Sequence, residues 1–460
     1  MIELDTAEAE REEEDYGLGK STVQPVLEAL EAGDRDRLVA LLDALHPADI
    51  ADLLEQIGEN DRIRLVRLYG KDFDGEILSE LDENVREDVI EALHPDVLAE
   101  AMRDLESDDV VDIIEDLDES EREAILDVLD DSDRVAVEQA MTYPEFSAGR
   151  LMQREVVAVP EHWNVGQAID FLRKSENLPE QFYHLILVNP RMQPVGYVTL
   201  GRLLSSRRDR PLKDITEDSF RTFQVTEDEE NIAYAFNHYH LISAPVVDED
   251  GRLVGMITID DAMQVLDEEH EEDILRLAGV GEGSLSDNVG ETTRQRFPWL
   301  AVNLATAILA SAVIAQFEDT IARIVALAVL MPIVASMGGN AGTQALTVAV
   351  RALATRDLTG SNVWRVIRRE VLVGLANGLA FAVIMGAISA YWFGDPMIGV
   401  VIALAMVINL VVAGLAGIVV PVVLDRLGVD PALASGAFVT TVTDVVGFFA
   451  FLGLAAVLLL

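Results

Sequence analysis

Long apolar stretches dominate the last third of the chain. Five of them are long enough to cross a lipid bilayer, and they cover 297–317, 324–350, 371–394, 396–424 and 434–460. A membrane-spanning helix needs about 20 apolar residues. Because lipid offers no hydrogen bonds to the backbone, each stretch is expected to be helical. The hydrophobic pattern therefore predicts an all-α membrane domain of five helices.

Arginines predict how these helices are oriented. Arg294 and Arg296 precede the first stretch, and five more lie between the second and third stretches: Arg351, Arg356, Arg365, Arg368 and Arg369. Basic residues mark the cytoplasmic ends of membrane helices. An odd number of spans then places the C-terminus outside the cell. No signal peptide precedes the acidic start of the chain, so the N-terminal region is expected to be cytoplasmic.

The region before residue 141 repeats an apolar position every twelve residues. The repeated residues are Leu45, Ile57, Tyr69, Leu81, Leu93, Leu105, Leu117 and Leu129. Several are followed by segments that favour the start of a helix, such as HPAD, HPD and ESDD, and apolar residues at helical spacing fill the intervals. This pattern predicts an array of short stacked helices.

A different pattern begins at Tyr143. It runs strand, helix, strand, a turn with Gly or Pro, strand and helix, and it occurs twice. The arrangement resembles a tandem pair of CBS domains, modules that often sense adenine nucleotides or ions. In that family a T-x-x-D motif supplies a carboxylate to a ribose, and the second copy has it as Thr258 and Asp261. The first copy has Thr199 followed by Arg202, which argues against a nucleotide site of this kind there.

The excess charge is confined to the soluble part of the chain. The chain has 81 acidic and 34 basic residues, a formal net charge of −47, and residues 291–460 contain nine of each sign. Such acidity repels nucleic-acid phosphates and argues against a nucleic-acid partner. It suits cations, but four lysines against thirty arginines also indicate a halophilic background. An acidic residue alone is therefore not evidence of a ligand, and the absence of cysteine removes thiolate metal sites.

Asp444 is the only ionisable residue inside the five apolar stretches. It lies in the segment FVTTVTDVVGFFAF, and no Arg, Lys or His in the stretches can neutralise it. An unpaired carboxylate in hydrocarbon costs several kcal/mol, so Asp444 must be protonated, face water or hold a cation. Thr440, Thr441 and Thr443 place hydroxyl oxygens around it. We interpret Asp444 as functional; the alternative is a protonated acid in a hydrogen bond between helices.

A second unusual segment is SMGGNAGTQ, residues 336–344. Its two consecutive glycines, followed by Asn340, Gly342 and Gln344, are expected to loosen the helix and bring amides to membrane depth. Broken backbone at that depth is tolerated where it faces protein or a water-filled path. The alternative is a polar contact between helices.

The order of these parts resembles the MgtE family of magnesium channels. The motifs GGNAGTQ, RALATRDL and GVDPALASGAFVTTVTDVVGFFAF carry the resemblance, which covers essentially the whole chain after the acidic tail. It implies a homodimer whose pore, on the two-fold axis, is lined by the second and fifth spans, with a cytoplasmic gate that senses Mg²⁺. The expected fold is a multi-domain membrane protein, with an α-helical superhelical N domain, α/β tandem CBS domains and an all-α five-helix transmembrane domain. The expected boundaries are an acidic disordered tail at 1–21, the helical-repeat N domain at 22–141, CBS domains at 142–204 and 205–268, a connecting helix and linker at 269–296, and the pore domain at 297–460.

The resemblance also assigns roles to particular residues. In the pore it implies Asp444, Asn340 and Asp430, the last at the cytoplasmic mouth, and Thr441 is grouped with them as a hydroxyl neighbour of Asp444. In the cytosolic part it implies Mg²⁺-sensing acids at Glu76, Asp108, Asp112, Asp228, Glu230, Asp261, Glu269, Glu272 and Asp273. ATP is a further expected ligand, as a modulator bound through Thr258 and Asp261. Two departures are His240, where an acid is expected, and Gly436, where a larger polar residue can occur near the gate.

Physical reasoning supports this interpretation. Two copies of Asp444 on a two-fold axis could hold a hydrated Mg²⁺ without forming a tight dry cage. Glu269, Glu272 and Asp273 share one helical face and repel one another until cations neutralise them. The sequence thus predicts a channel, not an enzyme, that cytosolic Mg²⁺ closes. Two alternatives remain open: a proton- or sodium-coupled divalent cation transporter in which Asp444 cycles its proton, and a nucleotide-sensing membrane receptor.

Overall fold

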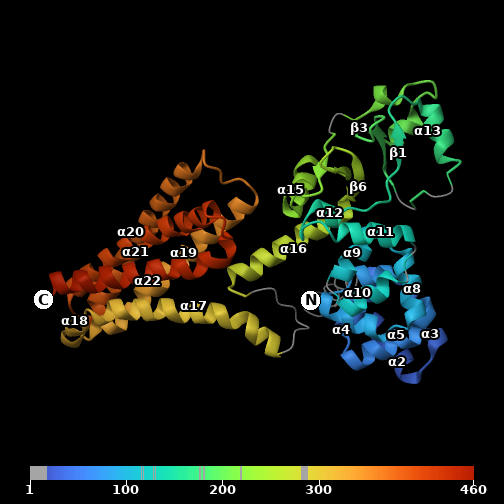
Figure 1. The fold of residues 1–460 in the computed structure, drawn as a ribbon. Helices are drawn as coiled ribbons and strands as arrows, with labels where there is room; N and C mark the ends of the chain where they lie inside the picture. Colours follow the sequence, from blue (N-terminus) through green and yellow to red (C-terminus); the bar gives the residue numbers. More distant parts are fainter. Residues whose placement is uncertain are drawn as a thin grey trace, which may run out of the picture. The chain divides into compact units, whose positions relative to one another are not determined.

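The computed structural model describes residues 18–280 and 289–460, apart from residues 116, 118, 128, 130, 176, 177, 180, 181, 218 and 219. Most of the expected acidic tail and part of the expected linker at 269–296 lie outside the described residues. The chain forms two compact units, Met1–Asp267 and Glu268–Leu460. Figure 1 shows one unit built from short helices and two small sheets and another built from long helices.

The first unit begins with an array of short helices. These are α2 Lys20–Ala32, α3 Arg35–Leu42, α4 Pro47–Gln56, α5 Glu59–Tyr69, the 3₁₀ turn η1 Gly70–Asp72, α6 Glu76–Ser79, α7 Glu83–Ala92, α8 Pro95–Asp104, α9 Ser107–Glu115, α10 Glu119–Leu126 and α11 Asp131–Ala140. The predicted twelve-residue period is confirmed, since helices begin at residues 47, 59, 83, 95, 107, 119 and 131. Only the step near residue 71 differs, where η1 and the short α6 replace a full helix.

The repeated apolar residue ends one helix and turns the chain into the next. Ile57, Leu93 and Leu105 follow the last residues of α4, α7 and α8 with extended backbone angles. The last carbonyls of a helix lack partners within it. Arginines of the following helices donate to some of them, as Arg62 Nε does to the Leu54 carbonyl at 2.9 Å and Arg122 Nε to the Ile114 carbonyl at 3.2 Å.

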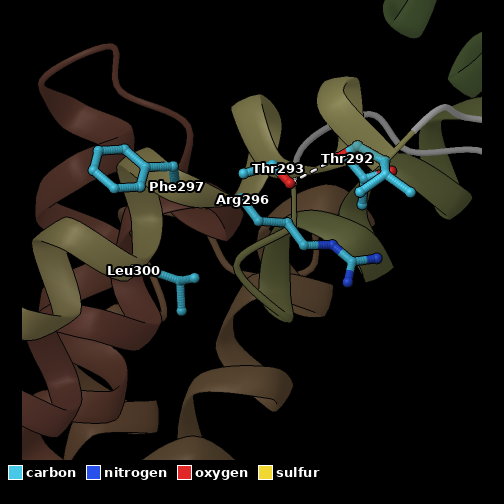
Figure 2. A pocket seen from close by; sticks show the side chains of 6 residues that line it. Thr292, Thr293, Arg296, Phe297 and Leu300 are labelled. Carbon is cyan, nitrogen blue, oxygen red and sulfur yellow. Dashed lines mark hydrogen bonds between the residues drawn. The ribbon is translucent and has the colours of Figure 1, made fainter.

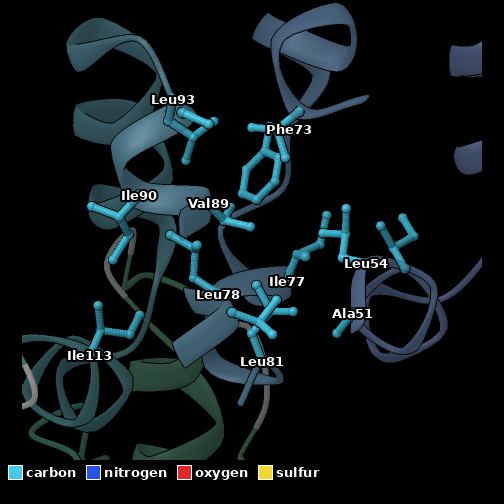
Figure 3. Packing of buried hydrophobic residues seen from close by; sticks show 14 of the residues in the cluster. Ala51, Leu54, Phe73, Ile77, Leu78, Leu81, Val89, Ile90, Leu93 and Ile113 are labelled. Atoms are coloured by element: carbon cyan, nitrogen blue, oxygen red, sulfur yellow. The ribbon is translucent and has the colours of Figure 1, made fainter. Parts of the chain in front are cut away.

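The apolar sides of these helices form one continuous core. Figure 3 shows its centre, where Ile77, Leu78, Val89 and Ile113 are fully buried and Phe73 lies beside them. Burying a Leu or Ile side chain stabilises a fold by about 1.5–3 kcal/mol. A short helix of two or three turns is marginal alone in water. The stacked core therefore holds the array together.

Two α/β modules follow the array, and they have the same sheet topology. Their strands are β1 Ala158–Pro160, β2 His184–Val188 and β3 Pro194–Thr199 in the first, and β4 Phe223–Gln224, β5 Ser243–Val247 and β6 Leu253–Thr258 in the second. The first strand of each sheet is parallel to the second, and the second is antiparallel to the third. His184 pairs with Thr199 as Ser243 pairs with Thr258, so the register is repeated as well. The two-copy pattern predicted from the sequence is confirmed.

Helices cover these sheets and connect them to their surroundings. They are α12 Ala148–Leu151, α13 Val165–Leu172, α14 Leu200–Ser205, η2 Leu212–Ile215, α15 Glu229–Tyr239 and α16 Ile259–Leu277. β2 and β5 are buried along their whole length. His240 occupies the position where an acid was expected. It follows α15 with φ 54°, in the left-handed region that ends many helices. α16 begins in the first unit and ends in the second.

The second unit contains five helices long and apolar enough to cross a membrane. After the end of α16, its described helices are α17 Val289–Ala315, α18 Glu318–Arg323, α19 Ala326–Ala354, α20 Val363–Phe393, α21 Pro396–Arg426 and α22 Pro431–Leu458, and α18 is the short one. α21 is the central helix, since 56% of its most apolar window is buried, against 6% for α17. The predicted fold class, a helical N domain followed by two α/β modules and five membrane helices, is confirmed.

The segment around the paired glycines differs from the prediction. α19 is a continuous helix from Ala326 to Ala354, so the expected loosening at 336–344 is wrong. Two of its three glycines, Gly338 and Gly342, serve close packing instead, whereas Gly339 has no neighbour within 4 Å of a built Cβ. A Cβ on Gly342 would lie 2.7 Å from Val439 Cγ1 of α22, and a Cβ on Gly338 would collide with the side chain of Asn409 in α21.

Candidate functional site

Asp444 lies in the middle of α22 and is partly exposed. Among the described residues, no hydrogen bond or ion pair engages its carboxylate. The neighbouring threonines do not donate to it. Thr441 Oγ1 donates to the Ala437 carbonyl at 2.5 Å and Thr443 Oγ1 to the Thr440 carbonyl at 2.9 Å. The expectation that hydroxyls surround Asp444 is therefore corrected: they bond to their own helix, as Ser and Thr often do.

Polar side chains form an exposed stripe on α19. The stripe consists of Ser336, Asn340, Thr343, Gln344 and Thr347, all exposed, whereas the opposite face buries apolar residues in the unit. α19 accordingly has the lowest mean hydropathy of the five spans, 1.3 against 1.8 to 2.7. Exposed amides and hydroxyls at membrane depth are unfavourable in lipid. This face is therefore expected to meet water or another polar surface.

The stripe and Asp444 lie at the same level of the unit. Gly342 of α19 packs against α22, where a Cβ added to it would be 2.7 Å from Val439 Cγ1 and 3.5 Å from Thr443 Cγ2. Asn340 is two residues from Gly342, and Asp444 follows Thr443 directly. The structure thus places Asn340 and Asp444 at a similar level along two packed helices.

Asn409 is a polar residue that sequence reasoning missed. It is 1% exposed in the central helix α21, and its Nδ2 atom donates to the Val334 carbonyl of α19 at 2.8 Å. On its other side lies Gly447 of α22, where an added Cβ would be 2.7 Å from Nδ2. Among the described atoms, Oδ1 has no hydrogen-bond partner. Asn409 joins the two helices that carry Asn340 and Asp444, and a polar residue inside an apolar stretch was the available signal.

Asp430 begins α22 and is already paired. Its Oδ1 accepts from the Ala432 N–H at 2.7 Å and its Oδ2 from Arg276 Nη1 at 2.7 Å. Arg276 also forms an ion pair with Glu272, one turn earlier on α16. Two predicted Mg²⁺ ligands, Asp430 and Glu272, are thus held by one guanidinium.

The end of α16 lies against the last turns of α19 and the first turns of α22. Leu277 packs with Leu346 and Val350 of α19 and with Ala432 and Val439 of α22. The nearest atom to a Cβ added on Gly436 would be the Leu277 carbonyl oxygen, at 3.9 Å. Gly436 therefore leaves room for the end of α16. Glu269, Glu272 and Asp273 lie on the face of α16 that also carries Arg276, as predicted from their spacing.

Acidic side chains converge in the first unit where α9 meets the second CBS module. The cluster consists of Glu106, Asp108, Asp109, Glu155, Asp260 and Asp261, which interact electrostatically. Two hydrogen bonds connect the start of α9 with the segment 153–155: Gln153 Nε2 donates to Glu106 Oε2 at 2.5 Å, and Ser107 Oγ donates to Glu155 Oε2 at 2.9 Å. Asp108 is 8% exposed, and its Oδ2 has no hydrogen-bond partner among the described atoms.

These carboxyls have strongly raised pKa values. Burial, followed by repulsion from Glu155 and Asp261, raises the pKa of Glu106 to about 7. Burial and the charges of Asp261 and Glu106 raise the pKa of Asp109 to about 7. Burial raises the pKa of Asp261 to about 6 although its hydrogen bonds to Thr258 oppose the shift. The pKa of the buried Asp108 is raised well above its ordinary value, by burial and by the charges of Asp261, Asp109, Glu106 and Glu155. Such a cluster favours protons or cations.

The structure brings some predicted sensing residues to this cluster and leaves others apart. Asp108 and Asp261 belong to it, and the charge of Glu76 acts on Asp109. The charge of Asp112 also raises the pKa of Asp109, but the Asp112 carboxylate is paired with Arg86 Nη1 at 2.8 Å. No interaction between described residues joins the cluster to Asp228, which precedes α15, or to Glu230 in its first turn. In the described part of the chain, no three Asp, Glu or His side chains converge closely enough to hold a bare metal ion.

Sequence reasoning missed four members of the cluster: Glu106, Asp109, Glu155 and Asp260. The available signal was the segment ESDD, which places several acids at the start of one helix. The T-x-x-D motif of the second module is formed, since Asp261 Oδ2 accepts from Thr258 Oγ1 at 2.7 Å. In the first module Arg202 pairs with Glu217 Oε2 at 2.8 Å, which fits the expectation that this copy lacks the motif.

A hollow of about 340 Å³ lies at the start of α17, lined by Val289, Thr292, Thr293, Arg296, Phe297 and Leu300 (Figure 2). All these residues come from one helix. None is a predicted pore or sensing residue. Ligand pockets are usually built from polar groups that converge from several elements, so the hollow is not assigned a ligand.

Comparison with protein families gives matches in three parts of the chain. The model of MgtE, a divalent cation transporter, matches residues 331–454, and the model of the MgtE intracellular N domain matches residues 45–146. The CBS domain model matches residues 148–209 and 212–268.

Two magnesium transporters are similar to this chain over nine tenths or more of its length. The magnesium transporter MgtE of Thermus thermophilus is 33% identical over 438 residues, 94% of this chain and 97% of the relative. The magnesium transporter MgtE of Bacillus subtilis is 29% identical over 417 residues, 90% and 92% of the two chains. Among solved structures, the cytosolic domain of the Mg²⁺ channel MgtE in complex with ATP is 30% identical, with a TM-score of 0.49, and covers 53% of this chain and 99% of that one.

Proposed function

The chain belongs to the MgtE family of divalent cation transporters, and from this we propose that it is a homodimeric Mg²⁺ channel that closes when Mg²⁺ binds to its acidic cytosolic part. It is a multi-pass membrane protein with five spans. Beyond family membership, we propose that transport is by a channel, that Mg²⁺ closes it, and which residues form the pore, the sensor and the gate. The observation that carries it is the unpaired carboxylate of Asp444 at the level of an exposed polar stripe.

The pore is proposed to lie between the α19 and α22 helices of two chains. The stripe of Ser336, Asn340 and Thr343 is unfavourable against lipid but suits a water-filled path. A two-fold axis beside it would bring two copies of Asp444 together. Mg²⁺ gives up its water reluctantly, and one or two carboxylates commonly hold it through that water. Two aspartates can therefore attract a hydrated ion and still release it. Asn340 and Thr441 would line the same path.

The sensor is proposed to include the acidic cluster of the first unit. With Asp108, Asp109 and Asp261 ionised, burial and repulsion oppose the contact between α9 and the CBS module, as their raised pKa values indicate. A divalent ion bound through its waters would remove this penalty. Glu76 and Asp112 would contribute at its edge. Asp228 and Glu230 remain candidate Mg²⁺ ligands, but at a site separate from this cluster.

The gate is proposed to be the end of α16. Leu277 and Arg276 contact α19 and α22 where these helices reach the cytoplasm. Mg²⁺ held by Glu269, Glu272 and Asp273 would reduce the repulsion along this face and keep the helix end in place. Asp430 would then help to keep the pore closed, because it would hold the end of α16 through Arg276 or through a bound ion. The C-terminus is proposed to lie outside the cell, because α22 would begin at the cytoplasmic side.

ATP is proposed as a modulator of the second CBS module. Thr258 and Asp261 form the motif that could contact a ribose. Asp261 is also part of the acidic cluster. ATP and Mg²⁺ would therefore act on the same carboxylate.

The test of the pore is Mg²⁺ uptake by proteoliposomes that contain the full chain. Asp444→Asn should reduce the uptake at least tenfold while the dimer and its thermal unfolding stay unchanged. The matched control is Asp395→Asn. Asp395 caps α21 by accepting from the Met397 N–H, which Asn can do equally well. Uptake that is unchanged in Asp444→Asn would refute the pore assignment, and uptake driven by a proton gradient would favour the coupled transporter.

A further inference from the structure

An exposed stripe on α20 changes from apolar to basic at its cytoplasmic end. Leu372, Leu379 and Val383 are 54%, 55% and 74% exposed. The same helical face continues toward the start of α20 to Arg368 and to Trp364, which is 77% exposed. These five positions follow at steps of four and seven residues, so they lie above one another on one side of the helix.

The opposite face of α20 packs inside the unit. A Cβ on Gly374 or Gly378 would meet the backbone of Leu410 or Val407 in α21. Such close helix contact fixes the rotation of α20 about its axis. The stripe therefore points away from the unit, toward the surrounding lipid.

The length of α20 places the end of the stripe among lipid headgroups. The helix has 31 residues, which is about 46 Å at 1.5 Å per residue. The hydrocarbon core of a bilayer is only about 30 Å thick. The first two turns of α20, with Trp364, Arg365 and Arg368, thus extend into the cytoplasmic headgroup layer, where Trp and Arg are typically found.

Two arginines in these turns have no acidic partner among the described residues. Glu370 is the nearest acid in sequence, but it is paired with Arg369 at 2.8 Å and its side chain is only 12% exposed. Arg365 and Arg368 are both exposed and are neighbours at i and i+3. Together with the exposed indole of Trp364, these two guanidinium groups form a small basic patch at the start of α20. Arginine binds phosphate groups with two parallel hydrogen bonds.

We propose that Trp364, Arg365 and Arg368 bind the phosphate headgroup of an anionic phospholipid in the cytoplasmic leaflet, with its acyl chains along the apolar stripe of α20. The continuity of basic and apolar positions on one face fits a lipid. A free phosphate ion would use the arginines alone. A second copy of the chain fits less well, because a two-fold contact through this face would bring the same positive charges together.

The test is lipid retention by the purified full-length protein, measured by native mass spectrometry. The protein is equilibrated with phosphatidylglycerol or with phosphatidylcholine of the same acyl chains. Wild type should retain phosphatidylglycerol preferentially. In Arg365→Gln/Arg368→Gln the preference should fall about tenfold or more, because each arginine near an anionic surface contributes about a fivefold preference. Trp364→Leu should reduce retention without removing the preference for the anionic headgroup.

The matched control is Arg323→Gln. Arg323 is also exposed and has no acidic partner among the described residues, but it lies before α19, at the opposite end of the membrane helices. It should leave the preference unchanged. The proposal is overturned if the double variant retains phosphatidylglycerol like wild type, if inorganic phosphate displaces the lipid completely, or if the double variant changes only the oligomeric state. The measurement needs no ion flux, so its result is independent of the proposed channel.

Discussion

The guanidinium of Arg276 joins the end of α16 to the start of α22, with Nη1 at 2.7 Å from Oδ2 of Asp430. The same side chain pairs with Glu272. Both carboxylates were expected to bind Mg²⁺. In this chain one fixed positive charge lies between them and offsets one of their two negative charges, which would hold the end of α16 in place with less help from the ion.

Arg276→Gln should therefore weaken closure. It leaves Asp430 and Glu272 without their cation, so a higher Mg²⁺ concentration should be needed to close half of the channels. The expected shift is about two- to fivefold, because partly exposed ion pairs contribute up to about 1 kcal/mol. The measurement is the current as a function of cytosolic Mg²⁺. Arg426→Gln, which removes an exposed arginine at the end of α21, should cause no shift. An unchanged Mg²⁺ dependence in Arg276→Gln would show that the contact is not part of the gate.

Asn409→Leu should destabilise the membrane unit and reduce Mg²⁺ flux. It removes the hydrogen bond to the Val334 carbonyl and sets a branched side chain against Gly338 and Gly447. Losing a buried hydrogen bond of this kind costs about 1–3 kcal/mol, which should lower the thermal unfolding temperature. Asn377→Leu is the control, since Asn377 is an exposed amide of α20. Equal behaviour of the two variants would exclude a special role for Asn409.

A double-mutant cycle tests whether Asn409 and Gly338 fit each other. Gly338→Ala alone should be destabilising, because its Cβ collides with the Asn409 side chain. Adding Asn409→Ala should recover part of the stability by making room, while flux stays low because the hydrogen bond between α21 and α19 is still missing. Additive losses of stability would contradict this direct contact.

Asp108→Asn should make closure less dependent on Mg²⁺. Asp108 is buried among like charges, and a neutral side chain of nearly the same shape removes much of the repulsion. The closed state should then be populated at lower Mg²⁺, and the response should become less steep. Asp96→Asn, at a side chain that is 92% exposed on α8, is the control. If Asp108→Asn needed more Mg²⁺ to close, the residue would act mainly as a ligand.

The contact between α9 and the CBS module should weaken as pH rises. Burial raises the pKa of Glu106 and of Asp109 to about 7, from ordinary values of 4.5 and 3.8. The folded state therefore binds more protons than the unfolded state between these limits. The contact between α9 and the CBS module is therefore most stable below about pH 4, where Glu106 and Asp109 are protonated in both states, and it loses stability as pH rises toward 7. Without Mg²⁺, hydrogen exchange corrected for its intrinsic pH dependence should show less protection of α9 at pH 8 than at pH 6. Mg²⁺ should restore protection at pH 8, and greater protection at pH 8 in its absence would contradict the account.

The regular parts of the fold could be predicted because their signals are local. The twelve-residue period appears in the sequence as Ile57, Leu81 and Leu93, and the same residues end helices or fill the core in the structure. The five spans follow from hydropathy, and Asp444 stands out because it is the one charged residue in the five apolar stretches of the sequence.

The errors arose where a distant residue decides the local structure. Paired glycines normally suggest a flexible helix, but Gly338 is required by Asn409, which is 71 residues away in sequence. Arg276 and Asp430 are separated by 154 residues. In the cytosolic part the acids are so numerous that sequence could not separate Glu106 and Asp109, which are buried together, from solvated neighbours. Only packing distinguishes them.

The most direct test of the account is the Mg²⁺ current across patches that contain the full-length protein, recorded while Mg²⁺ at the cytosolic face is raised. The account predicts a current that follows the electrochemical gradient of Mg²⁺, is independent of a proton gradient and falls as cytosolic Mg²⁺ rises. Asp444→Asn should abolish the current, whereas Asp108→Asn should change only its dependence on cytosolic Mg²⁺. A current that persists in Asp444→Asn, or one that cytosolic Mg²⁺ does not reduce, would contradict the account.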